Sequence, residues 1–393
     1  MAKVFKIITA IALVFACVSL SFVGYAQYEI PNEIRVEKAE NIKLNSFYTA
    51  KISNADSKNA DIMAFGIIPA KSAKLTLSTR RYMVVSGDVF GIKLYTKGLI
   101  VTQVGKVKTI KDTVIPGADA GLKNGDMIIS VNGKRVTQNT QLEDAVKKSN
   151  GKALKLVVKR NQEKLNLNIK PEIDKNDGVY RIGVWVRDSC AGIGTMTFYD
   201  RNTGVFAGLG HAVCDVDTGQ LMPLSDGEAM SADIKGCYKG VNGNPGELCG
   251  VFTGKSIGNL TENHTTGIYG KLDDFDKNAQ VMPVAQKQEV KEGAAQIVST
   301  VDKKGPRYYD VEITKIYSSK NSLQKNMSVK ITDDRLIKKT GGIVQGMSGS
   351  PIIQNGMLVG AVTHVYVNDS LQGYGVFAEN MVDEMDRLQK TAA

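Results

Sequence analysis

A group of small residues between two apolar runs constrains the C-terminal part of this chain more than any other feature. In the segment GIVQGMSGSPIIQNG, residues 342–356, Gly346 and Gly349 flank Ser348, and Pro351 begins the second apolar run. Glycines permit unusual backbone angles, let another part of the chain approach closely and leave amide N–H groups free to point at one position. Such a loop can hold an oxyanion, although a tight turn between two strands would use the same residue types.

The N-terminus has the pattern of an exported protein. Lys3 and Lys6 are followed by 20 uncharged residues, IITAIALVFACVSLSFVGYA. This layout predicts that residues 1–27 form a signal peptide or a retained membrane anchor, and both remain open. Cys17 lies within the apolar run rather than at its end, which argues against a lipoprotein site.

Composition bounds the class of protein. The chain has 393 residues, of which 42% are apolar, enough for two or three packed cores. Its net charge of +10 is spread along the sequence without a basic helix or an aromatic-interleaved basic stripe. We therefore expect solubility and a mild attraction to anionic membranes, but no nucleic-acid partner.

Four cysteines lie in the second half of the chain: Cys190, Cys214, Cys237 and Cys249. Export permits disulfides, but nothing selects among the three possible pairings, and free thiols remain open. A zinc site that combines these cysteines with His211 lacks a tight C-x-x-C pair. We expect no metal and no cofactor.

The region after residue 27 changes character twice. Residues 28–83 are a β-rich N-terminal region without recognisable chemistry, and residues 84–171 combine short strands with an amphipathic helix. The second region resembles a PDZ domain, and four short segments carry the resemblance: Phe90-Gly91-Ile92, Ala120-Gly121-Leu122, Gly125-Asp126 and Val131-Asn132-Gly133. The resemblance implies an α+β fold that binds extended peptides, with the amides of Phe90, Gly91 and Ile92 receiving a C-terminal carboxylate. A PDZ fold that serves only as an internal spacer or clamp remains the alternative.

The last part of the chain reads as mainly β. A charged, glycine-containing linker at 172–179 precedes a region, 180–393, of short strand patterns separated by Gly, Asn and Asp. Its one convincing helix is the terminal segment AENMVDEMDRLQKT. This spacing favours a β-barrel or sandwich.

An acyl-transfer serine needs a general base, and the chain offers three histidines. His211 follows the apolar segment GVFAGLG, so its imidazole is expected to emerge at a strand end. His264 is expected to be a polar loop residue and His364 a packed structural residue. His211 is therefore the candidate partner of Ser348.

The order of these segments resembles that of trypsin-like serine proteases. In that fold the base comes from the first β-barrel and the nucleophile from a G-x-S-G-x-P loop of the second, followed by a strand pair and a terminal helix. The resemblance implies a double β-barrel with Ser348 as nucleophile, His211 as base, and the amides of Gly346 and Ser348 as the oxyanion hole. Ser350 is the less favoured nucleophile.

A closer resemblance is to the stage IV sporulation protein B peptidase family of endospore-forming bacteria. The segments RDSCAGIGTMTFYD, GLGHAVCDVDTG and TGGIVQGMSGSPIIQNGMLVGAVTHVYVND carry it, together with the preceding PDZ pattern. It implies an exported, self-cleaving serine endopeptidase, anchored or released, in the space between forespore and mother cell. Its expected partners are itself, the membrane and a regulatory membrane protein whose cleavage triggers intramembrane proteolysis and mother-cell sigma factor activation. A catalytically inert PDZ-containing scaffold is the alternative.

The same resemblance implies the triad acid. It places the acid in the segment ITDDRL at Asp333, which lies 15 residues before Ser348. Asp333 also fits the N-cap of a short helix that ends at Gly-Gly. Asp334, Asp215 and the acidic segment 272–276 remain alternatives.

Overall fold

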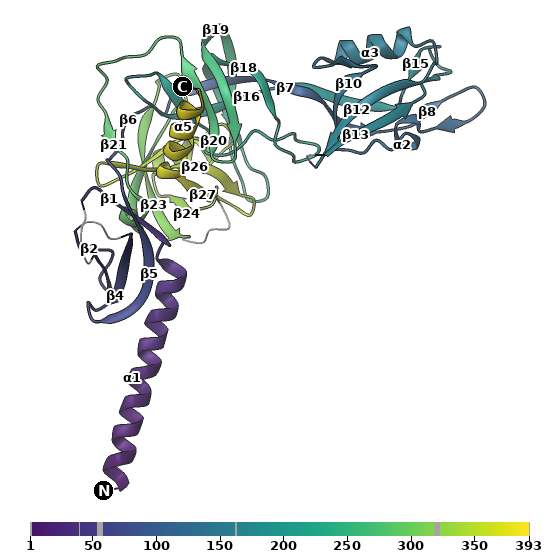
Figure 1. Ribbon diagram of the computed structural model, residues 1–393. Coiled ribbons are helices and arrows are strands. Elements are labelled where there is room, and N and C mark those ends of the chain that lie inside the picture. The colour runs from purple at the N-terminus through teal and green to yellow at the C-terminus, as the bar shows by residue number, and fades with distance from the viewer. Residues whose placement is uncertain (1, 39, 53–57, 162, 318–322, 393) are drawn as a thin grey trace.

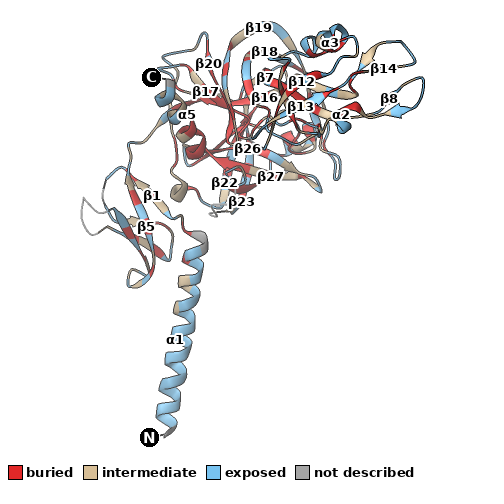
Figure 2. Cartoon of the chain, turned by 45° about the vertical axis from the view of Figure 1, so that its right-hand side comes forward, coloured by how far each residue is buried: buried red, intermediate tan, exposed pale blue. Residues whose placement is uncertain are grey.

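The structure is a computed structural model that describes residues 2–38, 40–52, 58–161, 163–317 and 323–392 (Figure 1). Helix α1 (Ala2–Glu29) projects away from the rest of the molecule, and most of it is exposed (pale blue in Figure 2). Apolar residues are exposed along its length. Its segment Lys3–Gln27 is the one helix among the described residues that is long and apolar enough to cross a bilayer. This helix is therefore a possible signal or membrane anchor.

A small sheet follows α1 and has its own core. Its five strands have the order β1-β5-β4-β3-β2, with β1 parallel to β5. The strands are β1 (Glu33–Val36), β2 (Ile42–Lys43), β3 (Tyr48–Lys51), β4 (Asn59–Ala64) and β5 (Ile68–Leu77). Ile34, Tyr48 and Ile62 are fully buried in it. Arg35 forms an ion pair with Asp383 in the last helix, so this sheet contacts the main body.

Two β-barrels make up that body. In the first, six strands follow the order β7-β18-β19-β20-β17-β16, and β16 pairs again with β7 to close the ring. They are β7 (Val89–Val104), β16 (Val184–Tyr199), β17 (Val205–Gly208), β18 (Leu224–Tyr238), β19 (Glu247–His264) and β20 (Gly267–Leu272). The short strand β6 (Tyr82–Val85) pairs with β16 and with β21 (Met282–Pro283).

The second barrel is closed by the order β22-β23-β24-β27-β26-β25. Its strands are β22 (Gly293–Ser299), β23 (Arg307–Ile316), β24 (Met327–Ile331), β25 (Pro351–Gln354), β26 (Met357–Tyr366) and β27 (Asp369–Phe377). The helical elements are η1 (Lys287–Glu289), α4 (Asp334–Thr340) and α5 (Ala378–Ala392). Many residues of the strands of both barrels are buried (red in Figure 2), and the predicted mainly β, double-barrel fold is confirmed.

The PDZ unit projects from the first barrel (Figure 1). Its sheet continues β7 through β10 (Met127–Val131), β12 (Leu154–Arg160) and β13 (Glu163–Ile169), and α3 (Asn139–Lys148) packs beside it. The short elements are β8 (Val107–Lys108), β9 (Thr113–Val114), α2 (Pro116–Asp119), β11 (Lys134–Arg135), β14 (Glu172–Ile173) and β15 (Tyr180–Arg181). Its core includes the fully buried Leu99, Ile128 and Val158.

The way the two units join corrects the expected domain boundaries. β7 begins in the first barrel and ends in the PDZ unit, and β16 returns along it from Val184 to Thr195. The PDZ unit is thus inserted between two strands of the first barrel. A division into 84–171 and 180–393 does not separate the units, because the first half of β7 belongs to the barrel.

Candidate active site

The serine loop of the second barrel is anchored to the first barrel. The Thr195 amide donates to the Ser348 carbonyl (2.9 Å), and the Thr195 hydroxyl donates to the Gly346 carbonyl (2.9 Å). Gly349 has φ 97°, and a Cβ added there would lie 1.9 Å from the Thr195 carbonyl oxygen. Position 349 therefore requires glycine for both its conformation and this close approach.

Two amides of the loop have no hydrogen-bond acceptor among the described residues. The amides of Met347, Gly349 and Ser350 donate to backbone carbonyls, whereas those of Gly346 and Ser348 donate to no acceptor in the described part of the chain. Unpaired amides two residues apart are what an oxyanion hole needs. The assignment of Gly346 and Ser348 to such a hole stays a prediction.

His211 follows β17 through a left-handed turn at Leu209 and Gly210, with φ values of 64° and 69°. A Cβ added at Gly210 would lie 3.0 Å from Thr363 Cγ2, so the turn packs against β26. The ring of His211 lies 4.5 Å from the ring of His364, centroid to centroid, at an angle of 36°. The Ser348 hydroxyl donates to the carbonyl of Thr363 (2.6 Å). The structure thus brings Ser348 and His211 to adjacent residues of β26.

The protonation of His211 suits a base. Burial lowers its pKa, so the ring is neutral near pH 7. Nδ1 lies 2.8 Å from the Ala212 carbonyl, which can only accept a hydrogen bond, so Nδ1 carries the hydrogen and donates it. Nε2 is then unprotonated and free to take a proton. Ser348 does not hydrogen bond to His211 in the described structure, and a rotation of its side chain away from Thr363 is needed to form that bond.

Asp333 has partners of its own. Its carboxylate accepts from the amides of Arg335 (2.8 Å) and Leu336 (3.4 Å), which confirms the N-cap interpretation for α4. The Arg335 hydrogen bond is the largest cause that lowers the pKa of Asp333 to about 2. Neither His211 nor Ser348 is among the hydrogen-bond or ion-pair partners of Asp333 in the described part of the chain.

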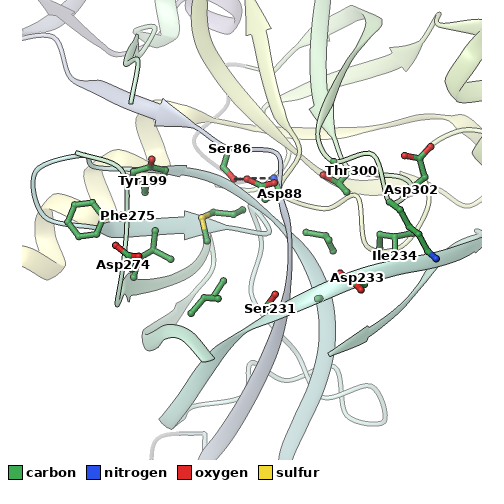
Figure 3. Close-up of a pocket in the computed structure, with 17 residues that line it drawn as sticks. Ser86, Asp88, Tyr199, Ser231, Asp233, Ile234, Asp274, Phe275, Thr300 and Asp302 are labelled. Carbon is green, nitrogen blue, oxygen red and sulfur yellow. Dashed lines mark hydrogen bonds between the residues drawn. The ribbon is translucent and has the colours of Figure 1, made fainter. Parts of the chain in front are cut away.

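The other acidic alternatives have different partners. Asp215 is fully buried and forms an ion pair with Arg187 (2.8 Å). Asp274, from the acidic segment 272–276, lines a separate cavity of about 450 Å³ between the barrels (Figure 3). Neither His211 nor Ser348 lines that cavity. Among the described residues, the carbonyl of Ala212 is the hydrogen-bond partner of the His211 ring.

The expected carboxylate-binding loop of the PDZ unit needs correction. Phe90, Gly91 and Ile92 lie within β7, in the first barrel, and each pairs with β16 on one side and β18 on the other. A Cβ added at Gly91 would lie 2.5 Å from Phe252, so glycine serves barrel packing there. These residues are not a free loop and have no open edge for a peptide. The Gly-apolar pair that enters the PDZ sheet is Gly98-Leu99.

The remaining candidates have structural surroundings. Ser350 is fully buried and its hydroxyl donates to Ser299 (3.0 Å). His264 contacts the hydroxyl of Thr266 (2.9 Å) through Nδ1. The five cysteines are free, and no group of three or more potential metal ligands occurs among the described residues.

Two barrels, a glycine-bounded serine of the second, a histidine of the first and an inserted PDZ unit define a PDZ-containing serine endopeptidase. The chain belongs to the SpoIVB peptidase S55 family, whose model matches residues 178–382, more than half of the sequence. A PDZ domain model matches residues 115–160.

Shorter similarities link the chain to other proteases. It is 44% identical over 66 residues to serine protease HTRA1 of Xenopus tropicalis, covering 17% of this chain and 14% of that protein. It is 38% identical over 66 residues to the regulator of sigma-W protease RasP of Bacillus subtilis, covering 17% of this chain and 16% of that protein. The chain thus spans only a small part of these curated relatives.

Solved structures align at low TM-scores. The PDZ domain of an SdrC-like protein from Listeria monocytogenes aligns with 23% of this chain and 87% of its own, with 26% identity and a TM-score of 0.19. The active form of the Rv3671c protease from M. tuberculosis aligns with 50% of this chain and 74% of its own, with 12% identity and a TM-score of 0.30.

Proposed function

We propose that this chain is an exported, self-cleaving serine endopeptidase of sporulation. Its protein substrate is a regulatory membrane protein in the space between forespore and mother cell. Cleavage of that protein triggers intramembrane proteolysis and activates a mother-cell sigma factor. The family match and the exposed apolar helix α1 support the proposal. The observation that carries its chemistry is the meeting of Ser348 and His211 at Thr363 and His364.

The proposed first step is an attack by Ser348 on the scissile carbonyl. Ser348 Oγ leaves its hydrogen bond to Thr363, and His211 Nε2 takes its proton and later gives it to the leaving amine. The oxyanion of the tetrahedral intermediate lies between the free amides of Gly346 and Ser348. Each such donor contributes about 3–4 kcal/mol to transition-state stabilisation.

In this proposal, uncharged groups orient the base. The Ala212 carbonyl fixes the Nδ1–H tautomer of His211, and the His364 ring packs against the imidazole. A carboxylate in contact would stabilise the imidazolium more strongly than a carbonyl does. The described site therefore favours a neutral His211 between turnovers.

The role in sporulation is tested in sporulating cells that carry Ser348→Ala at the native locus. We expect the variant to be exported at the normal level while both its self-truncation and the cleavage of the regulatory membrane protein stop. Normal cleavage of that membrane protein in the presence of the variant would contradict the proposed substrate. Continued self-truncation would instead contradict the proposed nucleophile.

A further inference from the structure

The strand-adding edge of the PDZ unit is already occupied. In the PDZ sheet, β7 has β10 on one side, where Leu99 pairs with Ile128. On its other side it pairs with the start of β16, antiparallel, over Val184–Arg187. A peptide that binds a PDZ domain by strand addition occupies this kind of position, between a sheet edge and a helix. β16 also contacts α3, which lies beside that edge.

The segment Val184–Asp188 makes the contacts of a bound peptide. Val184 and Val186 pack against the buried core of the PDZ unit, whereas Trp185 points outward and is 54% exposed. The Asp188 carboxylate accepts a hydrogen bond from the amide of Asn139, the first residue of α3 (2.8 Å). The hydroxyl of Thr96 donates to the Asp188 carbonyl (3.0 Å).

Arg187 connects this segment to the loop that follows His211. Its guanidinium forms an ion pair with the carboxylate of Asp215 (2.8 Å), and the geometry of this pair is not that of a hydrogen bond. The guanidinium also forms an ion pair with the carboxylate of Asp217 (2.7 Å). Asp215 is fully buried and also accepts from the amides of Asp217 and Thr218. Asp215 lies four residues after His211, so Arg187 holds the loop that carries the base.

We propose that Val184–Asp188 is the resident ligand of the PDZ groove and that Arg187 couples its seating to the His211 loop. Another peptide enters the groove only by displacing this segment. Displacement moves Arg187 away from Asp215 and loosens the loop. The PDZ unit then acts as an internal clamp on the peptidase site. The effect on catalysis rests on the proposed function, whereas the occupancy of the groove does not.

Occupancy is tested with the full-length protein in detergent micelles by amide hydrogen exchange and mass spectrometry. We expect slow exchange in residues 184–188 of the wild type. Val186→Asp, which places a charge against the PDZ core, should speed that exchange at least tenfold, and the isosteric Val186→Thr should change it much less. Fast exchange of this segment in the wild type, or equal exchange in all three proteins, would overturn the proposal.

A probe peptide with an apolar C-terminal residue and a free carboxylate provides a second measurement of occupancy. Trp185 is the only tryptophan in the chain, so its emission reports on the segment directly. We expect micromolar peptide to shift this emission in Val186→Asp and not in the wild type. Micromolar binding to the wild type with unchanged exchange in 184–188 would place the peptide site elsewhere and overturn the proposal.

Coupling is tested with Arg187→Gln, with Asp217→Asn as the matched control. Asp217 contacts the same guanidinium but lies at the exposed end of the pair. We expect Arg187→Gln to speed exchange in residues 211–222 and to slow fluorophosphonate labelling of Ser348 at least fivefold, with Asp217→Asn within twofold of the wild type. Wild-type exchange in 211–222 of Arg187→Gln would overturn the coupling. A different result would be faster exchange in residues 211–222 of Arg187→Gln while fluorophosphonate fails to label even the wild type. That result would contradict the proposed catalytic residues and leave the coupling intact.

Discussion

At the scale of single residues, the site combines groups that local sequence indicates with one that it does not. The glycines around Ser348 and the small residues before His211 are visible in the sequence, and both serve close approach between the barrels. The packing of His364 against His211 depends on β26 passing the end of β17, which no local pattern encodes. The family resemblance implies Asp333 as the acid, and in the structure this residue is the N-cap of α4.

Asp333→Ala should lower stability and spare the chemistry. Removal of an N-cap side chain costs about 1 kcal/mol of unfolding free energy. Asp333→Asn retains a cap and is the matched control. Fluorophosphonate labelling of Ser348 should stay within about twofold of the wild type in both variants. A normal melting temperature with lost labelling would show that Asp333 acts at the active site after all.

Acid unfolding adds a second readout for Asp333. Its pKa is lowered from 3.8 to about 2, so its charge stabilises the fold above pH 4 and that contribution is lost as the pH falls from 4 to 2. The wild type should therefore lose more stability over this interval than Asp333→Ala, as measured by chemical denaturation. Identical pH dependence of the two proteins would contradict this contribution of the Asp333 carboxylate.

His364 is expected to position His211 through its ring. Burial is the largest cause that lowers the pKa of His364 to about 4, so the ring is neutral at pH 7. Ring pairs contribute about 0.5–1.5 kcal/mol, so His364→Ala should slow labelling of Ser348 by about tenfold at most. His364→Phe, which keeps a ring, should recover most of that rate. Equal losses in both variants would indicate that a ring nitrogen of His364 takes part.

At the scale of elements, one long strand explains where sequence reasoning fails. β7 has 16 residues and contains two glycines, Gly91 between two apolar residues and Gly98 before Leu99. The Φ-Gly-Φ pattern at Phe90-Gly91-Ile92 resembles a PDZ loop, but this part of β7 is paired on both sides in the first barrel. The later PDZ motifs, including the Asn132-Gly133 turn with φ values of 49° and 77°, lie in the PDZ unit as expected. Local motifs identify a unit but not which half of a shared strand belongs to it.

The position of Gly91 inside the first barrel predicts the effect of Gly91→Val. Valine at position 91 meets Phe252 in the first barrel, so overpacking should cost about 1–3 kcal/mol of stability. Labelling of Ser348 and self-truncation should fall together, and the melting temperature should fall with them. Normal stability and normal labelling with altered self-truncation would instead support a peptide-binding role for Phe90-Gly91-Ile92.

At the scale of the whole molecule, α1 fits a signal or membrane anchor by length and composition, and the small sheet lies between it and the peptidase barrels (Figure 1). Phe5 and Ile11 are among the apolar side chains that α1 exposes, whereas Ala26 is buried against the small sheet. A variant that lacks residues 2–20 should therefore keep its fold and move from the detergent phase to the aqueous phase in a detergent partition assay. Aqueous partition of the intact full-length chain would contradict a membrane role for α1.

The pairing of Ser348 with His211 is the central claim, and the site of fluorophosphonate modification tests it most directly. Peptide mass mapping of the labelled full-length protein should place the adduct on Ser348. Ser348→Ala and His211→Ala should each remove the adduct while circular dichroism and the melting temperature stay near those of the wild type. Ser350→Ala should retain an adduct on Ser348 in whatever protein remains folded. An adduct on Ser350, or labelling at the wild-type rate in His211→Ala, would contradict the account.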